Sequence, residues 1–80
     1  MNNRKHISLA ELPDGQTAVI VNILGGRNLI KRLADLGMSS GTTITVLRKS
    51  LFSGPVQVEV SGSRLVLGGG MASKIFVELK

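Results

Sequence analysis

Apolar and polar residues alternate along most of the chain with the period of two that is typical of half-buried β-strands. The clearest run is residues 55–61, in which three valines at alternate positions share one face of an extended chain: Val56, Val58 and Val60. Similar patterns predict further strands over residues 17–24, 42–49, 64–67 and 74–79. Five short strands joined by glycine-rich turns, without the spacing of βαβ units, predict a mainly β fold in the form of a small five-stranded antiparallel barrel.

One segment departs from this alternation and has helical spacing instead. Leu29, Leu33 and Leu36 recur at i, i+4 and i+7, which places all three on one face of a helix of about two turns. A helix this short does not persist alone in water. We therefore expect its leucine face to be docked, most simply across one open end of the barrel.

The ends of this helix are also marked in the sequence. Asn28 is a suitable N-cap residue, and Gly37 is suited to the left-handed conformation that ends many helices. Met38 follows Gly37, where the Schellman type of helix ending places an apolar residue against the last turn. The sequence thus predicts one short helix that ends at Gly37, with Lys31 and Arg32 facing outward.

Length and composition limit what such a barrel can be. With 80 residues the chain is expected to form one domain over residues 1–80, with its core at about 8–79. Cysteine is absent, so packing alone must stabilise the fold, which fits a reducing compartment. The longest apolar stretch is far short of the roughly 20 residues of a membrane-spanning helix, and no signal peptide is evident. We expect a cytoplasmic protein.

Charge adds a candidate binding face. Ten basic residues against five acidic ones give a formal net charge of +5, and within residues 27–49 Asp35 alone opposes five basic residues. A field of this sign favours nucleic acid, an anionic membrane surface or an acidic protein as partner. The alternative is a solvated face that only keeps a small domain soluble.

Residue types that carry catalysis or bind metals are scarce. His6 is the only histidine, and no group of His, Asp or Glu has the spacing of metal ligands, so we expect neither a metal site nor a cofactor. The segment GGGMASK at residues 68–74 resembles a phosphate-binding loop, but Ser73 and Ile75 stand where that loop needs glycine and a hydroxyl-bearing residue. Because no nucleophile has a credible base, the sequence predicts a protein that is not an enzyme.

Two blocks of the chain match the pattern of a known family. The first, R-L-x-x-L-G-[LM]-x-x-G, comprises Arg32, Leu33, Leu36, Gly37, Met38 and Gly41. The second continues in register from residue 54 to residue 77. Over residues 9–77 the chain therefore resembles the FeoA family of ferrous iron transport accessory proteins. The resemblance implies an SH3-like barrel, a bacterial or archaeal cytoplasm, and a role beside FeoB, the membrane GTPase that carries Fe(II) inward.

The resemblance and the charge together predict a non-enzymatic accessory protein that binds and modulates the cytoplasmic portion of a FeoB-like transporter. The candidate partner-binding residues are Lys31 and Arg32 on the helix, and Leu51 and Phe52 in a loop, where they either cover the core or meet a partner. A small basic barrel that binds nucleic acid, or a regulatory protein-interaction module, is the alternative function. The scarcity of aromatic residues for base stacking argues against nucleic acid. An anionic membrane surface and a second copy of the chain stay open as further partners.

Overall fold

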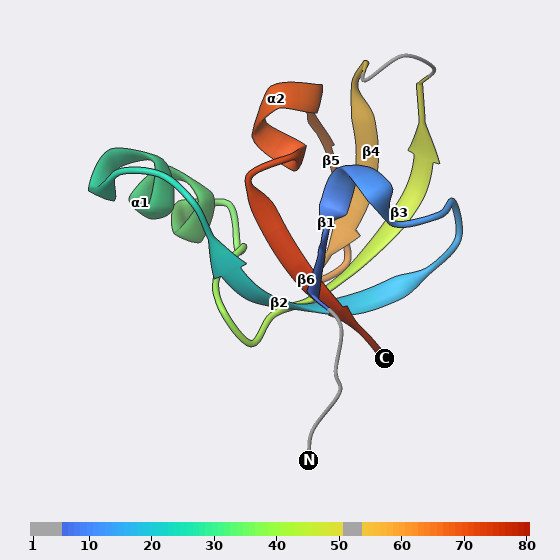
Figure 1. Cartoon of the computed structure of the whole chain (residues 1–80), viewed down its shortest axis with the longest axis horizontal. Coiled ribbons are helices and arrows are strands. Elements are labelled where there is room, and N and C mark those ends of the chain that lie inside the picture. The colour runs from blue at the N-terminus through green and yellow to red at the C-terminus, as the bar shows by residue number, and fades with distance from the viewer. Residues whose placement is uncertain (1–5, 51–53) are drawn as a thin grey trace.

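The computed structural model describes residues 6–50 and 54–80, which form a curled antiparallel sheet with short helices at its rim (Figure 1). The strand order in the sheet is β1-β6-β2-β3-β4-β5. The strands are β1 His6–Ser8, β2 Thr17–Ile23, β3 Thr43–Lys49, β4 Val56–Val60, β5 Ser63–Leu67 and β6 Ile75–Leu79. The helices are η1 Leu9–Glu11, α1 Arg27–Asp35 and α2 Gly69–Ala72. The mainly β, SH3-like fold is confirmed.

The structure adds a sixth strand, β1, and the single-turn helix α2 to the predicted elements, while η1 forms where the capping-box spacing of Ser8 and Glu11 predicts a helical turn. β1 has three residues and pairs with β6, with Ile7 opposite Val77. A strand this short has too few positions for an alternating pattern to be recognised, so the sequence does not predict it. Within the described residues β1 and β5 are the two edges of the sheet and are not paired with each other.

The curl of the sheet follows from bulges in its two longest strands. The pairing of β2 with β6 shifts between Ile20 and Asn22, and the pairing of β3 with β4 shifts between Val46 and Arg48. A bulge bends its strand and increases the local twist, which allows a flat sheet to turn towards a barrel. The curled sheet thereby surrounds one apolar core.

The alternating positions fill that core as the pattern predicts. The three valines of β4 are at most 2% exposed, and the alternate residues of β3 and β6 are also buried. The buried apolar side chains form one cluster, to which each of the strands β2, β3, β4, β5 and β6 contributes. No buried polar or charged residue is present in the described part of the chain, so the core is stabilised by apolar packing.

The end of α1 has the predicted Schellman geometry. Gly37 has a φ of +91°, its N–H donates to the Ala34 carbonyl at 2.9 Å, and the Met38 N–H donates to the Leu33 carbonyl at 2.8 Å. Met38 and Leu33 are both fully buried and belong to the same apolar cluster, in agreement with the apolar pairing that often accompanies this ending. The start of α1 differs from the prediction, because Gly26 rather than Asn28 is the N-cap residue and it has no side chain with which to cap.

The leucine face of α1 is only partly covered. Leu33 is fully buried and Leu29 is half-buried, but Leu36 is 50% exposed, so the prediction that all three leucines are buried is wrong for Leu36. Figure 1 shows α1 standing out from the barrel beyond the end of β2, with its first turn farther from the barrel than its last. Leu36 is the C-cap residue, where the helix ends. A short helix docked through one leucine leaves its flanking apolar residues in water.

Candidate functional site: the exposed face of helix α1

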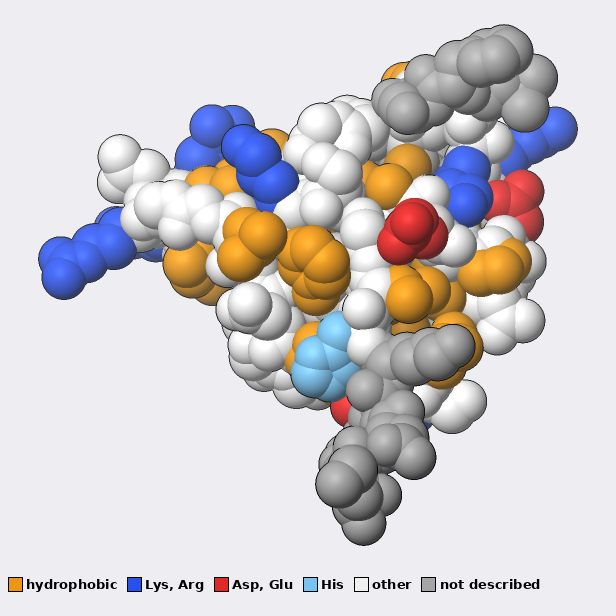
Figure 2. All heavy atoms as spheres, in the orientation of Figure 1, with side chains coloured by type: hydrophobic (Ala, Val, Ile, Leu, Met, Phe, Trp, Pro, Cys, Tyr) orange, Lys and Arg blue, Asp and Glu red, His pale blue; other side chains and the backbone are white. Residues whose placement is uncertain are grey.

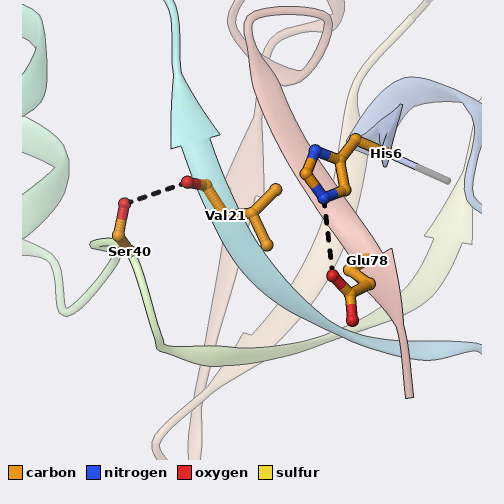
Figure 3. A network of polar contacts seen from close by, with 4 residues as sticks. All are labelled: His6, Val21, Ser40 and Glu78. Atoms are coloured by element: carbon orange, nitrogen blue, oxygen red, sulfur yellow. Dashed lines mark hydrogen bonds and ion pairs between the residues drawn. The ribbon is translucent and has the colours of Figure 1, made fainter. Parts of the chain in front are cut away.

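The described residues offer little for catalysis or metal binding. Within residues 6–50 and 54–80, no group of three or more His, Asp or Glu side chains converges, and no pocket is present. His6 on β1 lies 3.4 Å from Glu78 on β6, through Nε2 and Oε1, in a pair at the sheet edge (Figure 3). In the same view, the Ser40 hydroxyl donates to the Val21 carbonyl at 3.3 Å and ties the segment after α1 to β2. These contacts join chain segments and form no cavity for a substrate.

Exposed apolar side chains gather instead around α1. Five large hydrophobic residues of the described chain are prominently exposed, and three of them fall within residues 24–36: Leu24, Ile30 and Leu36. Figure 2 shows hydrophobic and basic side chains side by side over this part of the molecule. Arg27, Lys31 and Arg32 on α1 are all exposed. Exposed apolar and basic side chains that cluster on one projecting helix are typical of a binding surface.

The helical geometry divides this face into two strips on opposite sides of buried Leu33. At about 100° per residue, Ile30 lies roughly 60° to one side of Leu33 and Leu36 roughly 60° to the other. Arg27, Ile30 and Lys31 are neighbours at i, i+3 and i+4, and we call them the tip strip. Arg32 and Leu36, at i and i+4 near the end of the helix, form the inner strip.

The inner strip lies close to the barrel. A Cβ atom on Gly37, the residue after Leu36, would lie 3.6 Å from Cγ1 of Val60 at the end of β4. The chain then returns to the sheet through Gly41, whose φ is +94° and whose N–H donates to the Ile20 carbonyl at 2.7 Å. The motif residues Leu33, Gly37, Met38 and Gly41 therefore fix the orientation of α1, while Leu36 of the same motif is left exposed.

The structure separates the predicted partner-binding residues. Lys31 and Arg32 are both exposed, as predicted, but about 100° apart around the helix, and so they belong to different strips. Leu51 and Phe52 lie outside the described residues. The strand ends that flank them are joined by a hydrogen bond from the Ser50 N–H to the Pro55 carbonyl at 3.0 Å, and Figure 1 places these ends across the barrel from α1.

Sequence reasoning misses the apolar part of this face. It assigns every leucine at helical spacing to the core, and this assignment hides Leu36. Two signals were available: Ile30 falls outside the i, i+4, i+7 series, and Gly25-Gly26 separates Leu24 from the helix. Gly25 has a φ of +146°, and a Cβ atom there would come within 2.6 Å of the Leu29 side chain. Glycine at position 25 therefore allows the backbone to pass close to the Leu29 side chain just before α1 begins.

The fold and this face define a class: a small SH3-like barrel domain with an exposed helical face. A family model described as the FeoA domain matches residues 7–79. A protein of Methanocaldococcus jannaschii that carries the name Fe(2+) transport protein A is 33% identical over 70 residues, which are 88% of this chain and 83% of that protein. A crystal structure described as iron uptake regulatory protein (FeoA) superposes with a TM-score of 0.83 at 36% identity, over 94% of this chain and 99% of that one. This chain belongs to the FeoA family.

Two further similarities show where such domains occur in longer chains. A protein of Porphyromonas gingivalis described as an Fe(2+) transport protein A/Fe(2+) transporter FeoB fusion is 37% identical over 71 residues, which are 89% of this chain and 8% of that protein. A manganese-dependent transcriptional repressor superposes with a TM-score of 0.87 at 22% identity, over all of this chain and 45% of that one. The second similarity is one of fold alone. The FeoA family has an accessory role in ferrous iron transport.

Proposed function

We propose that this protein is a non-enzymatic, cytoplasmic accessory protein that binds the cytoplasmic portion of a FeoB-type ferrous iron transporter and modulates it. The observation that carries the proposal is the Porphyromonas gingivalis fusion, in which a region similar to this chain is part of the same polypeptide as FeoB. A covalent connection holds two domains at high effective concentration, so fusion is expected where the two parts act together.

The inner strip is the proposed contact with the transporter. Leu36 is half exposed and Arg32 is its neighbour one turn earlier, so the strip combines an apolar anchor with a guanidinium group. Arginine and large apolar side chains at the centre of a contact provide much of the binding free energy of protein interfaces. The Arg32 charge also favours an acidic surface on the partner and increases the rate of association. Leu51 and Phe52 are retained as a second candidate contact.

A pull-down tests this assignment. The full chain is immobilised and offered the cytoplasmic portion of the cognate FeoB-type transporter, with and without guanine nucleotide. We expect retention by the parent, and a loss of about tenfold in affinity for Leu36→Ser combined with Arg32→Glu, as is usual when an interface anchor is removed.

Val66→Ser combined with Lys80→Glu is the matched control, because both side chains are exposed, Val66 at 65%, and the formal charge falls by two as it does in Leu36→Ser with Arg32→Glu. The control should bind like the parent. If no retention occurs under any nucleotide condition, the proposed function is wrong. If both double variants bind like the parent, the contact lies elsewhere and Leu51 and Phe52 become the next residues to change.

A further inference from the structure

The tip strip is the part of α1 that the proposed transporter contact does not use. Its apolar residue, Ile30, is 41% exposed although it belongs to a helix of nine residues with a strongly one-sided distribution of apolar residues. Arg27 precedes Ile30 by three residues and Lys31 follows it directly, and both are exposed. Asp35 is the only acidic residue on the helix, and it lies one turn beyond Lys31 towards the barrel.

The shape of this region restricts the kind of partner that fits it. No pocket is present in the described part of the chain, and Figure 1 shows the first turn of α1 as the outermost part of the projection. Ile30 projects from this helix beside two long basic side chains, and the described residues form no pocket there into which a partner could insert a side chain. This region is suited to a soft, flat and anionic surface, into which an aliphatic side chain can insert while the cations stay among phosphates.

We propose that the tip strip of α1 binds the surface of an anionic lipid bilayer, with Ile30 inserted at the level of the headgroups and with Arg27 and Lys31 on lipid phosphates. Charge complementarity carries the assignment, since the protein has a formal net charge of +5 and its projecting helix has three basic residues against one acidic residue. The inference rests on the proposed function only for its biological context, because an accessory protein of a membrane transporter works beside a bilayer.

The two strips can then be occupied at the same time, one by lipid and the other by a protein. With the tip strip on the bilayer, the inner strip lies on the other side of Leu33 and faces away from the lipid, so it stays accessible to the cytoplasmic portion of a transporter. Two basic residues and one aliphatic side chain give weak, reversible binding, so the bilayer contact adds to a protein contact and does not replace it. Binding to both at once raises the effective concentration of the protein at the transporter.

Vesicle binding tests the inference without any transporter present. The full chain is sedimented with vesicles of phosphatidylglycerol and phosphatidylcholine, and with vesicles of phosphatidylcholine alone, at low and at moderate salt. We expect binding to the anionic vesicles only, weakened by salt. Arg27→Glu combined with Lys31→Glu should reduce the partition coefficient by about tenfold or more, since each basic residue near an anionic surface contributes several-fold.

The control variant has the same net charge as the tip-strip variant. Arg48→Glu combined with Lys80→Glu also replaces two exposed cations by two anions, which lowers the formal charge by four from +5 to +1, but at positions away from α1. This variant should bind within about threefold of the parent, because only the general attraction is reduced. Equal losses in the two double variants would show that net charge alone is responsible and would overturn the assignment to the tip strip.

Insertion of the apolar residue is measured separately. The chain has no tryptophan, so Ile30→Trp introduces a single fluorescent reporter at an exposed position. We expect its emission to shift to the blue with anionic vesicles, while Val66→Trp on β5 should show no shift. Thermal melts verify that each variant is folded.

Absence of any shift for Ile30→Trp would contradict the insertion. If Arg27→Glu with Lys31→Glu abolishes retention by the transporter while the parent ignores vesicles, the tip strip contacts a protein and the lipid assignment is wrong. Failure of vesicle binding with intact retention by the transporter would overturn this inference alone and leave the proposed function in place.

Discussion

The barrel and the projecting helix α1 differ in how many contacts restrain each residue. In the barrel, a central residue such as Val58 is paired through its backbone on both sides and buried at 0% exposure. In α1, Leu33 is the only residue of the helix that is fully buried, and the backbone bonds of the helix are local. The barrel is therefore stabilised by many distant contacts at once, whereas the position of α1 depends on Leu33 and on the turn that follows it. Such a helix is free to present side chains to a partner.

The largest effect that tests this comparison is expected at Leu33. Leu33→Ala removes the one fully buried leucine of α1 and should lower the free energy of unfolding by about 2–4 kcal/mol, in the range of buried leucine truncations. In a domain of this size that is a large fraction of the total stability. Chemical denaturation measures it.

Leu36→Ala is the matched control, because it removes the same atoms from a leucine one turn later that is half exposed. We expect a change of less than about 1 kcal/mol there. If both variants lower the free energy of unfolding equally, Leu36 is as well packed as Leu33. The description of the inner strip as exposed would then be wrong.

An intermediate effect is expected at the turn after α1. Gly37→Ala places a Cβ atom on a residue with a φ of +91°, so the variant should lose about 1 kcal/mol through backbone strain. Gly70→Ala, within α2, has no positive φ and no atom within 4 Å of the new Cβ, and it should be neutral or slightly stabilising. A Gly37 variant as stable as the parent would show that the left-handed residue does not restrain α1.

These two regions also differ in how well the sequence predicts them. The alternating valines of β4 and the SH3-like barrel are predictable because each inward position is restrained by a sheet face of fixed period. The Schellman ending at Gly37 and Met38 is predictable because it is a local backbone requirement. The exposure of Leu36 is not predictable, because spacing tells which side chains share a helix face and not which of them the rest of the fold covers.

The candidate site shows the same limit. The exposure of Lys31 and Arg32 follows from helical periodicity, which places each of them about 100° or more around the helix from buried Leu33. Their separation into two strips depends on where Leu33 docks, and only the three-dimensional structure provides that. Leu51 and Phe52 stay a prediction from sequence alone.

The smallest effects on stability, and the sharpest test of the two strips, are expected for single charge reversals at Lys31 and Arg32. Both side chains are exposed, so Lys31→Glu and Arg32→Glu should each change the free energy of unfolding by less than about 0.5 kcal/mol. The two variants have the same net charge, which leaves position as the difference between them. We expect Lys31→Glu to weaken binding to anionic vesicles several-fold while retention by the transporter is nearly unchanged, and Arg32→Glu to have the opposite pattern. Both effects should diminish with added salt, since exposed charges are screened. If each reversal weakens both associations equally, α1 presents one continuous face to a single partner, and the division into a lipid-binding and a protein-binding strip fails.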